Sequence, residues 1–262
     1  MQASISRIGR LSDVDFDFPD ALSFFSPYLG YYVKEVLGVG GEAYLSKDPE
    51  GAISGLFIYD SVEKDGTIFT RSREVFDYFY ALKPFNSLFA ELETEHKGEV
   101  YDIYMTDPLR SLTDHRFSHE ISIADESDVD ALERFMSLTH PGINRNWVRV
   151  AMNDGDKCLT VRLDNEIAGL GWLSIVNNIG RLHSLYVKPQ FRQIGIGRDI
   201  FYARLFWLKS KHVRLAFSEI ARENTPSSRI AVKGNMTTCG RVFQYFRKTA
   251  NEKTRSSPAA KF

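Results

Sequence analysis

The sequence is short of cysteine, of long apolar runs and of net charge, and each shortage excludes a class of protein. Its 262 residues include two cysteines, too few for a disulfide framework and without the spacing of a metal site. No segment approaches the ~20 apolar residues of a membrane-spanning helix, and the N-terminus carries charges where a secretory signal would be apolar. A net charge of −1, from 33 basic and 34 acidic residues, gives no general attraction for nucleic acid. We therefore expect a cytoplasmic monomer or homodimer with no bound metal, membrane or nucleic acid.

The chain does have enough apolar material for a core. Apolar residues make up 43% of it and charged residues 26%, which is ordinary for a soluble globular protein. Its length suits one large domain or two of common size. Phe and Tyr are concentrated in the first half, while the second half shows clear helix and strand periods.

The most informative segment is a strand, a glycine turn and a helix start, in that order. An apolar run from Leu182 to Lys188 predicts a strand, and a helix follows from about Gly197. The turn between them has the form Arg-x-x-Gly-x-Gly. The first N–H groups of a helix have no intrahelical partner, and glycines let an anion approach them. We expect a phosphate site made of the backbone of Gln193, Ile194, Gly195, Ile196 and Gly197, with charge from Arg192 and Arg198.

The spacing of this loop argues against two other nucleotide sites. A dinucleotide-binding fold would show Gly-x-Gly-x-x-Gly after a parallel strand, and a P-loop would continue into Lys-Ser/Thr. Neither pattern is present here.

Periodicity predicts the remaining elements of the second half. Helices are expected from about Asp125, with Val129, Leu132, Phe135 and Leu138 on one face, over 144–152, over 197–212 and after Asn224. Strands are expected over 158–163, 167–176, 182–188, 213–220 and 242–246. The first three strands should form an antiparallel meander, and the fourth should run parallel to the third, because a helix joins them.

This order, with three local features, resembles the GNAT superfamily of acyl-CoA-dependent N-acetyltransferases over roughly residues 118 to 247. The features are Val187-x-Pro189, the Arg192-x-x-Gly195-x-Gly197 loop, and Asn224 shortly after the fourth strand, with Ser227 and a helix following. The resemblance implies an α+β fold, a mixed and mostly antiparallel sheet flanked by helices. It also implies transfer of an acetyl group from acetyl-CoA to a primary amine, in a ternary complex.

The resemblance further implies cofactor contacts outside the loop. The backbone of Leu185, Tyr186 and Val187 would receive the pantetheine arm, and Asn224 and Ser227 would contact that arm and the 3′ end. Many family members place a Tyr near the CoA sulfur where this chain has Ala231. Tyr186 is the remaining candidate for a general acid.

The chain offers two candidates for taking the proton from the amine. His183 lies in the cofactor strand and has a useful intrinsic pKa, and Glu219 lies in the next strand. Strand alternation would place His183 on the same face as Leu185 and Val187. Deprotonation through water is a third route.

The first half echoes the second. Expected strands at 51–59 and 67–70, a helix at 74–81 and a strand at 100–104 repeat its core order. We predict a tandem GNAT-like architecture with a degenerate first copy, since the matching loop contains Arg71-Ser72-Arg73 and no glycine. The predicted domains are 1–115 and 116–250, followed by a flexible tail at 251–262. The N-terminal domain would wall the acceptor cleft or form a dimer contact.

Two readings of function stay open. One is an acetyltransferase whose acceptor is a peptide N-terminus, a lysine, a polyamine or an aminoglycoside. The other is a non-catalytic acyl-CoA-binding or scaffolding protein, which Ala231 favours and the intact glycine loop argues against.

Overall fold

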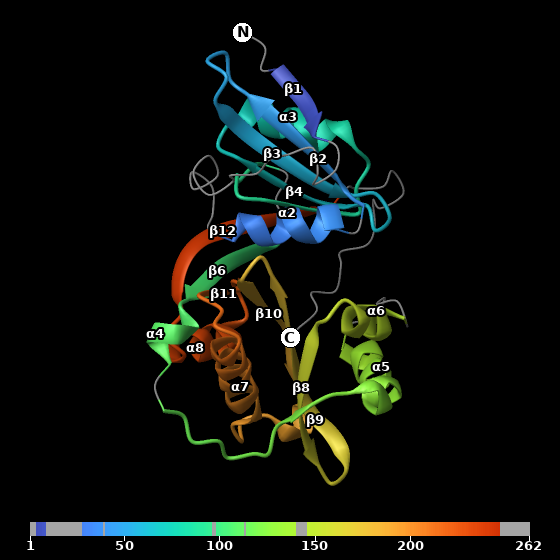
Figure 1. The fold of residues 1–262 in the computed structure, drawn as a ribbon, viewed down its shortest axis with the longest axis vertical. Helices are drawn as coiled ribbons and strands as arrows, with labels where there is room; N and C mark the ends of the chain where they lie inside the picture. Colours follow the sequence, from blue (N-terminus) through green and yellow to red (C-terminus); the bar gives the residue numbers. More distant parts are fainter. Residues whose placement is uncertain are drawn as a thin grey trace. The chain divides into compact units, whose positions relative to one another are not determined.

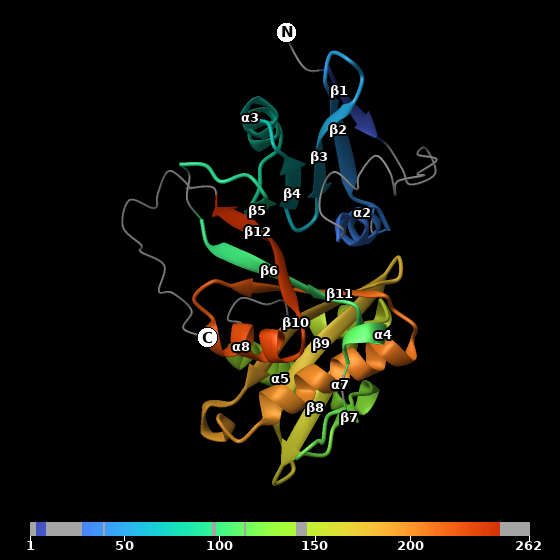
Figure 2. The same ribbon diagram turned by 90° about the vertical axis from the view of Figure 1, so that its left-hand side faces the viewer.

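The computed structural model describes residues 4–8, 28–38, 40–95, 98–112, 114–139 and 146–246. They form two compact units (Figure 1, Figure 2). Unit 1 falls within Met1–Ile103, Ile220–Asn224 and Cys239–Phe262, and unit 2 comprises Tyr104–Glu219 and Thr225–Thr238. The tail expected at 251–262 lies outside the described residues. None of the described helices is long and apolar enough to cross a membrane.

Unit 2 is built on a sheet that matches the predicted meander. Strands β7, β8, β9 and β10 pair antiparallel in that order, and β11 pairs parallel with β10. The parallel pairing follows from the helix between them, as the sequence predicted. The strands span Ser122–Ile123, Lys157–Leu163, Glu166–Val176, Ile179–Val187 and Leu215–Ala221.

Helices cover both faces of this sheet (Figure 1). On one face lie α5 and α6, which bury a cluster that includes Leu170 and Trp172 of β9. On the other face lies α7, against Gly169 and Gly171, which alternate with those two residues along β9. The helices of unit 2 are α4, α5, α6, α7 and α8, at Pro108–Ser111, Val129–Thr139, Trp147–Asn153, Ile196–Ser210 and Thr225–Lys233.

The start of α5 follows the sequence signal, but its buried face differs from the prediction. Asp125 forms a capping box with Asp128 in a 3-10 turn that leads into the helix. Leu138, predicted to be buried, is 78% exposed, and Met136 is buried in its place. The error arises from the assumed spacing of three, which drifts by about 60° around a helix at each step.

Glycines let α7 approach the sheet closely. A Cβ on Gly169 would lie 2.8 Å from Ile196, and one on Gly171 would lie 2.8 Å from Ile200. A Cβ on Gly180 would meet Leu208 at 2.6 Å. Side chains at these three strand positions would therefore push the helix away. This explains Gly169 and Gly171 in the predicted strand 167–176, whereas Gly180, expected in the turn before residue 182, lies within β10.

Unit 1 repeats the order of unit 2, which confirms the predicted tandem architecture. Strands β1, β2, β3 and β4 are antiparallel, α3 follows β4, and β5 pairs parallel with β4. The last strand, β12, pairs antiparallel with β5. The sequence did not predict β1, α2, β2 or β5. The elements of unit 1 span Ser4–Ile8 (β1), Leu29–Gly38 (α2), Glu42–Lys47 (β2), Ile53–Asp60 (β3), Asp65–Thr70 (β4), Arg73–Leu82 (α3), Ser87–Ala90 (β5), Val100–Thr106 (β6) and Thr237–Phe246 (β12), where β6 and β12 each also carry residues of unit 2.

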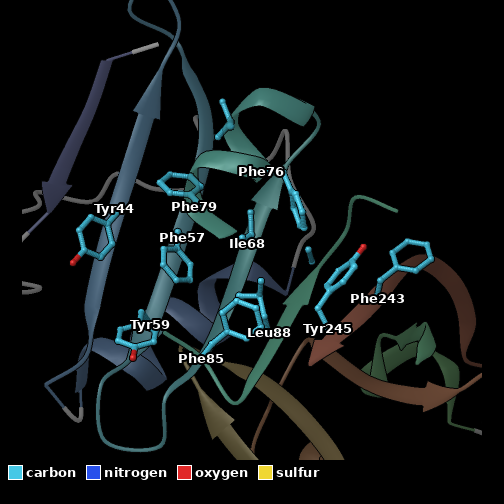
Figure 3. Close-up of a cluster of buried hydrophobic side chains, with 12 residues drawn as sticks. Tyr44, Phe57, Tyr59, Ile68, Phe76, Phe79, Phe85, Leu88, Phe243 and Tyr245 are labelled. Atoms are coloured by element: carbon cyan, nitrogen blue, oxygen red, sulfur yellow. The ribbon is translucent and has the colours of Figure 1, made fainter. Parts of the chain in front are cut away.

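The aromatic residues of the first half form the core of unit 1 (Figure 3). Phe76 and Phe79 of α3 point onto the sheet, where Phe57 lies 5.5 Å from Phe79 between ring centroids. Tyr245 of β12 joins them, with its ring 5.4 Å from Phe76 and its hydroxyl donating to the Leu92 carbonyl at 2.7 Å. The abundance of Phe and Tyr is therefore explained by packing.

Candidate active site

The glycine loop ends at a helix start that no side chain caps. Helix α7 begins at Ile196 with Gly195 as its N-cap, and Gly195 has a φ of 100°. Gln193, earlier in the loop, also has a positive φ, of 68°. Glycine adopts such angles without a Cβ clash, so the turn leaves the first N–H groups of α7 open to an anion.

The matching helix start in unit 1 is closed. Helix α3 has Ser72 as its N-cap, and the Ser72 side chain accepts a hydrogen bond from the Val75 N–H. Arg73 is held by Asp77, with Nε and Oδ1 2.9 Å apart. A hydroxyl therefore occupies the place where an anion would bind at this helix, which fits a degenerate first copy.

The two arginines of the loop have different positions. Arg192 turns back onto β10, where its Nε donates to the Val187 carbonyl at 3.0 Å and its guanidinium lies 5.4 Å from the centre of the Tyr186 ring. Arg198 stays at the helix start, and its Nη2 lies 3.3 Å from the position that a Cβ on Gly195 would take. Arg198 is thus the better placed of the two for a phosphate, while Arg192 also braces the turn.

Two histidines that sequence reasoning missed lie beside this loop. The side chain of Asp199, in the first turn of α7, is fully buried and accepts from His115 at 3.0 Å, from His119 at 2.8 Å and from the Ser118 N–H at 2.9 Å. Burial alone would raise the pKa of Asp199, but these bonds and Arg198 lower it. This cluster ties residues 115–119 to the start of α7.

The strands β10 and β11 pair over a short length only. Their parallel ladder joins Ile179 to Arg181 with Leu215 to Phe217, although β10 continues to Val187. Tyr186 and Val187 pair on their other side with β9. At residues 185–187, where the sequence predicted the pantetheine contacts, the edge of β10 that faces away from β9 therefore lies beyond the β10–β11 ladder.

A bulge interrupts β10 within this stretch. The register against β9 shifts between His183 and Tyr186, which leaves Ser184 and Leu185 opposite the single residue Gly171. Ser184 has a φ of 49°, in the left-handed region. A bulge takes backbone groups out of the ladder and turns the following side chains to the other face.

The bulge corrects one prediction. His183 does not share a face with Val187, because the extra residue reverses the alternation between them. His183 lies edge-on to Trp147 of α6, with ring centroids 6.4 Å apart, and Tyr186 packs against α5. Val187 faces α7 instead, with its Cγ2 3.4 Å from the Cβ position of Gly197.

His183 is nearly enclosed and held neutral. Its Nδ1 lies 3.3 Å from the Ser184 hydroxyl, and its Nε2 lies 3.7 Å from a carboxylate oxygen of Asp156. Burial lowers the pKa of His183 below 6.5, and the charges of Arg181 and Arg204 lower it further, while Asp156 opposes the change. The imidazole is therefore able to accept a proton near neutral pH.

Glu219 lies on β11 and pairs with Arg181 of β10. The Arg181 Nε and the Glu219 Oε2 are 3.2 Å apart, and the Glu219 side chain is 11% exposed. Burial raises the pKa of Glu219 to about 7, whereas the neighbouring guanidinium favours the carboxylate. The structure thus places both proton acceptors predicted from the sequence on neighbouring strands. His183 of β10 and Glu219 of β11 both follow the last residues of the short β10–β11 ladder, Arg181 and Phe217.

The remaining predicted residues lie near α8. The Asn224 N–H donates to the Ala221 carbonyl at 2.8 Å just before α8, and Ser227 lies in the first turn of that helix. Ala231 is fully buried. A short buried side chain at this place supplies no acidic hydrogen to a leaving group.

Comparison with known proteins agrees with this geometry. The model of the acetyltransferase (GNAT) family matches residues 98–233, just over half of the chain. The chain belongs to the GNAT family. No curated protein sequence matches the chain.

Solved structures show the same fold as this GNAT-family chain. A GCN5-related N-acetyltransferase from Sphaerobacter thermophilus is 13% identical, with a TM-score of 0.58 over 82% of each chain. A GNAT-family acetyltransferase from Colwellia psychrerythraea is 10% identical, with a TM-score of 0.62 over 94% of this chain and 100% of that one. A tandem GNAT protein from the clavulanic acid biosynthesis pathway is also 10% identical, with a TM-score of 0.56 over 95% and 100%. At these identities the likeness shows the fold, including its tandem form.

Proposed function

We propose that this protein transfers an acetyl group from acetyl-CoA directly to a primary amine. The observation that carries the proposal is the uncapped start of α7, which lies directly after the stretch of β10 that leaves its parallel ladder with β11. A free strand edge followed directly by a phosphate site fits two consecutive parts of acetyl-CoA, the pantetheine arm and the pyrophosphate. Members of the family are acyltransferases.

In this proposal the pyrophosphate binds the backbone N–H groups of the loop from Gln193 to Gly197. Arg198 adds positive charge there, and helix α7 adds the positive end of its dipole. The pantetheine arm lies along the backbone of residues 185–187. Asn224 and Ser227 contact the rest of the cofactor.

The bulge supports a place for the thioester. Ser184 and Leu185 are displaced from the ladder with β9, so a backbone N–H in this stretch is available to the carbonyl oxygen as it becomes negative. Fixed donors of this kind stabilise a tetrahedral intermediate more than the ground state. The amine nitrogen attacks the thioester carbon, a C–N bond forms, and the C–S bond then breaks to release the CoA thiolate.

The amine must lose a proton, and His183 or Glu219 takes it directly or through water. His183 is neutral at pH 7 because burial lowers its pKa, and Glu219 titrates at about 7 because burial raises its pKa. The two assignments predict different dependences of the acetyl-transfer rate on pH. The thiolate takes its proton from Tyr186 or from solvent, since Ala231 has none to give.

Turnover with a panel of amines tests the proposal. The assay measures release of the CoA thiol from acetyl-CoA in the presence of peptides with a free N-terminus, lysine peptides, polyamines and aminoglycosides. We expect thiol release that depends on one class of amine and a product that is heavier by one acetyl group. A protein that binds acetyl-CoA tightly but turns over none of these amines would instead be the non-catalytic acyl-CoA-binding protein that the buried Ala231 favours.

A further inference from the structure

Arg204 is a buried cation in the core of unit 2. It lies on the face of α7 that packs against the sheet, and it is 2% exposed. No carboxylate among the described residues forms an ion pair with it, and its Nε makes no hydrogen bond within the described part of the chain. Arginine is almost never fully buried without a partner charge, so its presence here needs a reason.

The guanidinium binds the backbone at the bulge. Its Nη1 donates to the Trp172 carbonyl at 2.9 Å and to the His183 carbonyl at 3.1 Å. The guanidinium also packs over Gly171, the residue before Trp172 in β9, where a Cβ would lie 3.1 Å from the Arg204 Cζ and Nε. The glycine therefore leaves the space that the guanidinium fills, directly opposite the residues that the bulge displaces.

Stability does not explain this arrangement. Removing a guanidinium from water costs several kcal/mol, and two carbonyls offset that cost only in part. Burial lowers the pKa of Arg204 to about 9, so the group still carries its charge at neutral pH. Apolar side chains at such positions are often as stable or more stable.

We propose that Arg204 is a positioning residue for acetyl transfer: it fixes the bulge between His183 and Tyr186 and places a positive charge beside it. This inference rests on the proposed function. The fixed bulge keeps a backbone N–H aimed at the thioester oxygen. The positive charge favours the oxyanion that forms there, since a charge in a site of low dielectric acts strongly on its neighbours.

The same charge acts on His183. A cation close to an imidazole disfavours protonation, and Arg204 and Arg181 both contribute in that direction, while Asp156 opposes them. The charged or titratable groups that face His183 are thus Arg181 of its own strand, Arg204 of α7 and Asp156, which precedes β8. Arg204 thereby keeps a proton acceptor neutral while it holds the backbone that carries it.

Substituting Arg204 by Met separates this role from a structural one. Methionine fills much of the same volume without charge. We expect Arg204→Met to unfold at a temperature equal to or higher than the wild type, with kcat reduced roughly ten- to a hundred-fold by misplacement of the backbone. The KM for acetyl-CoA should stay within about two-fold, because the loop at Gly195 is untouched. Arg204→Lys should recover part of kcat, and Arg214→Met, at an exposed arginine outside α7, should change neither value.

A second readout does not depend on turnover. Titration of the His183 imidazole followed by NMR should show a higher pKa in Arg204→Met than in the wild type, even if no acceptor amine is known. Wild-type kcat in Arg204→Met, or an unchanged His183 titration, would overturn the inference.

Arg204→Gln keeps the test valid if Arg204→Met does not fold. Its amide can still donate to one of the two carbonyls that the guanidinium binds but carries no charge, and we expect the same loss of kcat and the same rise in the His183 pKa. Failure of the wild type to bind acetyl-CoA would instead overturn the proposed function, and the His183 titration would then still report on Arg204.

Discussion

Replacing Glu219 by Gln should make the stability of unit 2 less sensitive to pH. The Glu219 carboxyl is 11% exposed, and its burial raises its pKa from 4.5 to about 7. The folded protein therefore binds a proton that the unfolded chain has released between these two values. The stabilising contribution of this group is complete below pH 4.5 and is lost as the pH rises to about 7.

The size of the effect follows from the two pKa values. One pKa unit corresponds to 1.36 kcal/mol, so a rise from 4.5 to about 7 is worth about 3 kcal/mol. Arg181 favours the carboxylate from 3.2 Å, which makes this figure an upper value. Glutamine carries no proton to lose, so the free energy of unfolding of Glu219→Gln, minus that of the wild type, should increase by up to about 3 kcal/mol between pH 4.5 and 8.

Tryptophan fluorescence reports the unfolding of unit 2, where Glu219 lies. The three tryptophans, Trp147, Trp172 and Trp207, all lie in unit 2. Urea unfolding at several pH values gives the free energies, and Glu120→Gln, at an exposed carboxylate, serves as the matched control. Any constant cost of leaving Arg181 without its partner cancels, because only the change with pH is compared. A difference that stays flat, or that falls as the pH rises, would refute the reasoning.

Three further changes test separate parts of the structure. Gly195→Ala should destabilise unit 2 by about 1–2 kcal/mol, because a Cβ is strained at a φ of 100°, and should weaken acetyl-CoA binding; an unchanged affinity would contradict the loop assignment. His183→Gln should lower kcat/KM roughly 10²–10⁴-fold if His183 is the base, and the wild-type rate should then fall only below pH 6.5. If the wild-type rate instead falls as the pH drops below about 7, and Glu219→Gln removes this dependence, the base is Glu219. Asp199→Asn should cost about 3 kcal/mol in urea unfolding, because it breaks a buried charged cluster with His115 and His119; a neutral result would show that the cluster does not tie residues 115–119 to α7.

The elements of unit 2 could be predicted because each carries its own local signal. Asp125 and Asp128 mark a helix start, and Gly195 with Gly197 marks the turn into α7. The bulge in β10 had no such signal. Ser184 adopts a left-handed φ without being a glycine or asparagine, and the carbonyl of the residue before it accepts a hydrogen bond from Arg204, which is distant in sequence. The face of His183 was therefore predicted wrongly from an alternation that the bulge reverses.

The first half was harder for a different reason. Its strands and helices are amphipathic, but their aromatic residues recur too densely for one period to stand out, so β2, α2 and β5 were missed. Tertiary clusters were also invisible. Asp199 joins His115 and His119 across 84 and 80 positions of sequence, and no local pattern connects them.

Calorimetric titration with acetyl-CoA tests the central claim most directly. The wild type should bind one equivalent with micromolar affinity, and a Gly195→Glu, Gly197→Glu double variant should lose binding while remaining folded, because carboxylates would occupy the anion site at the start of α7. Gly155→Glu, at a turn glycine with a similar φ of 96° and open space around it, should bind as the wild type does. A folded wild type that gives no heat with acetyl-CoA, or a double variant that binds normally, would contradict the account.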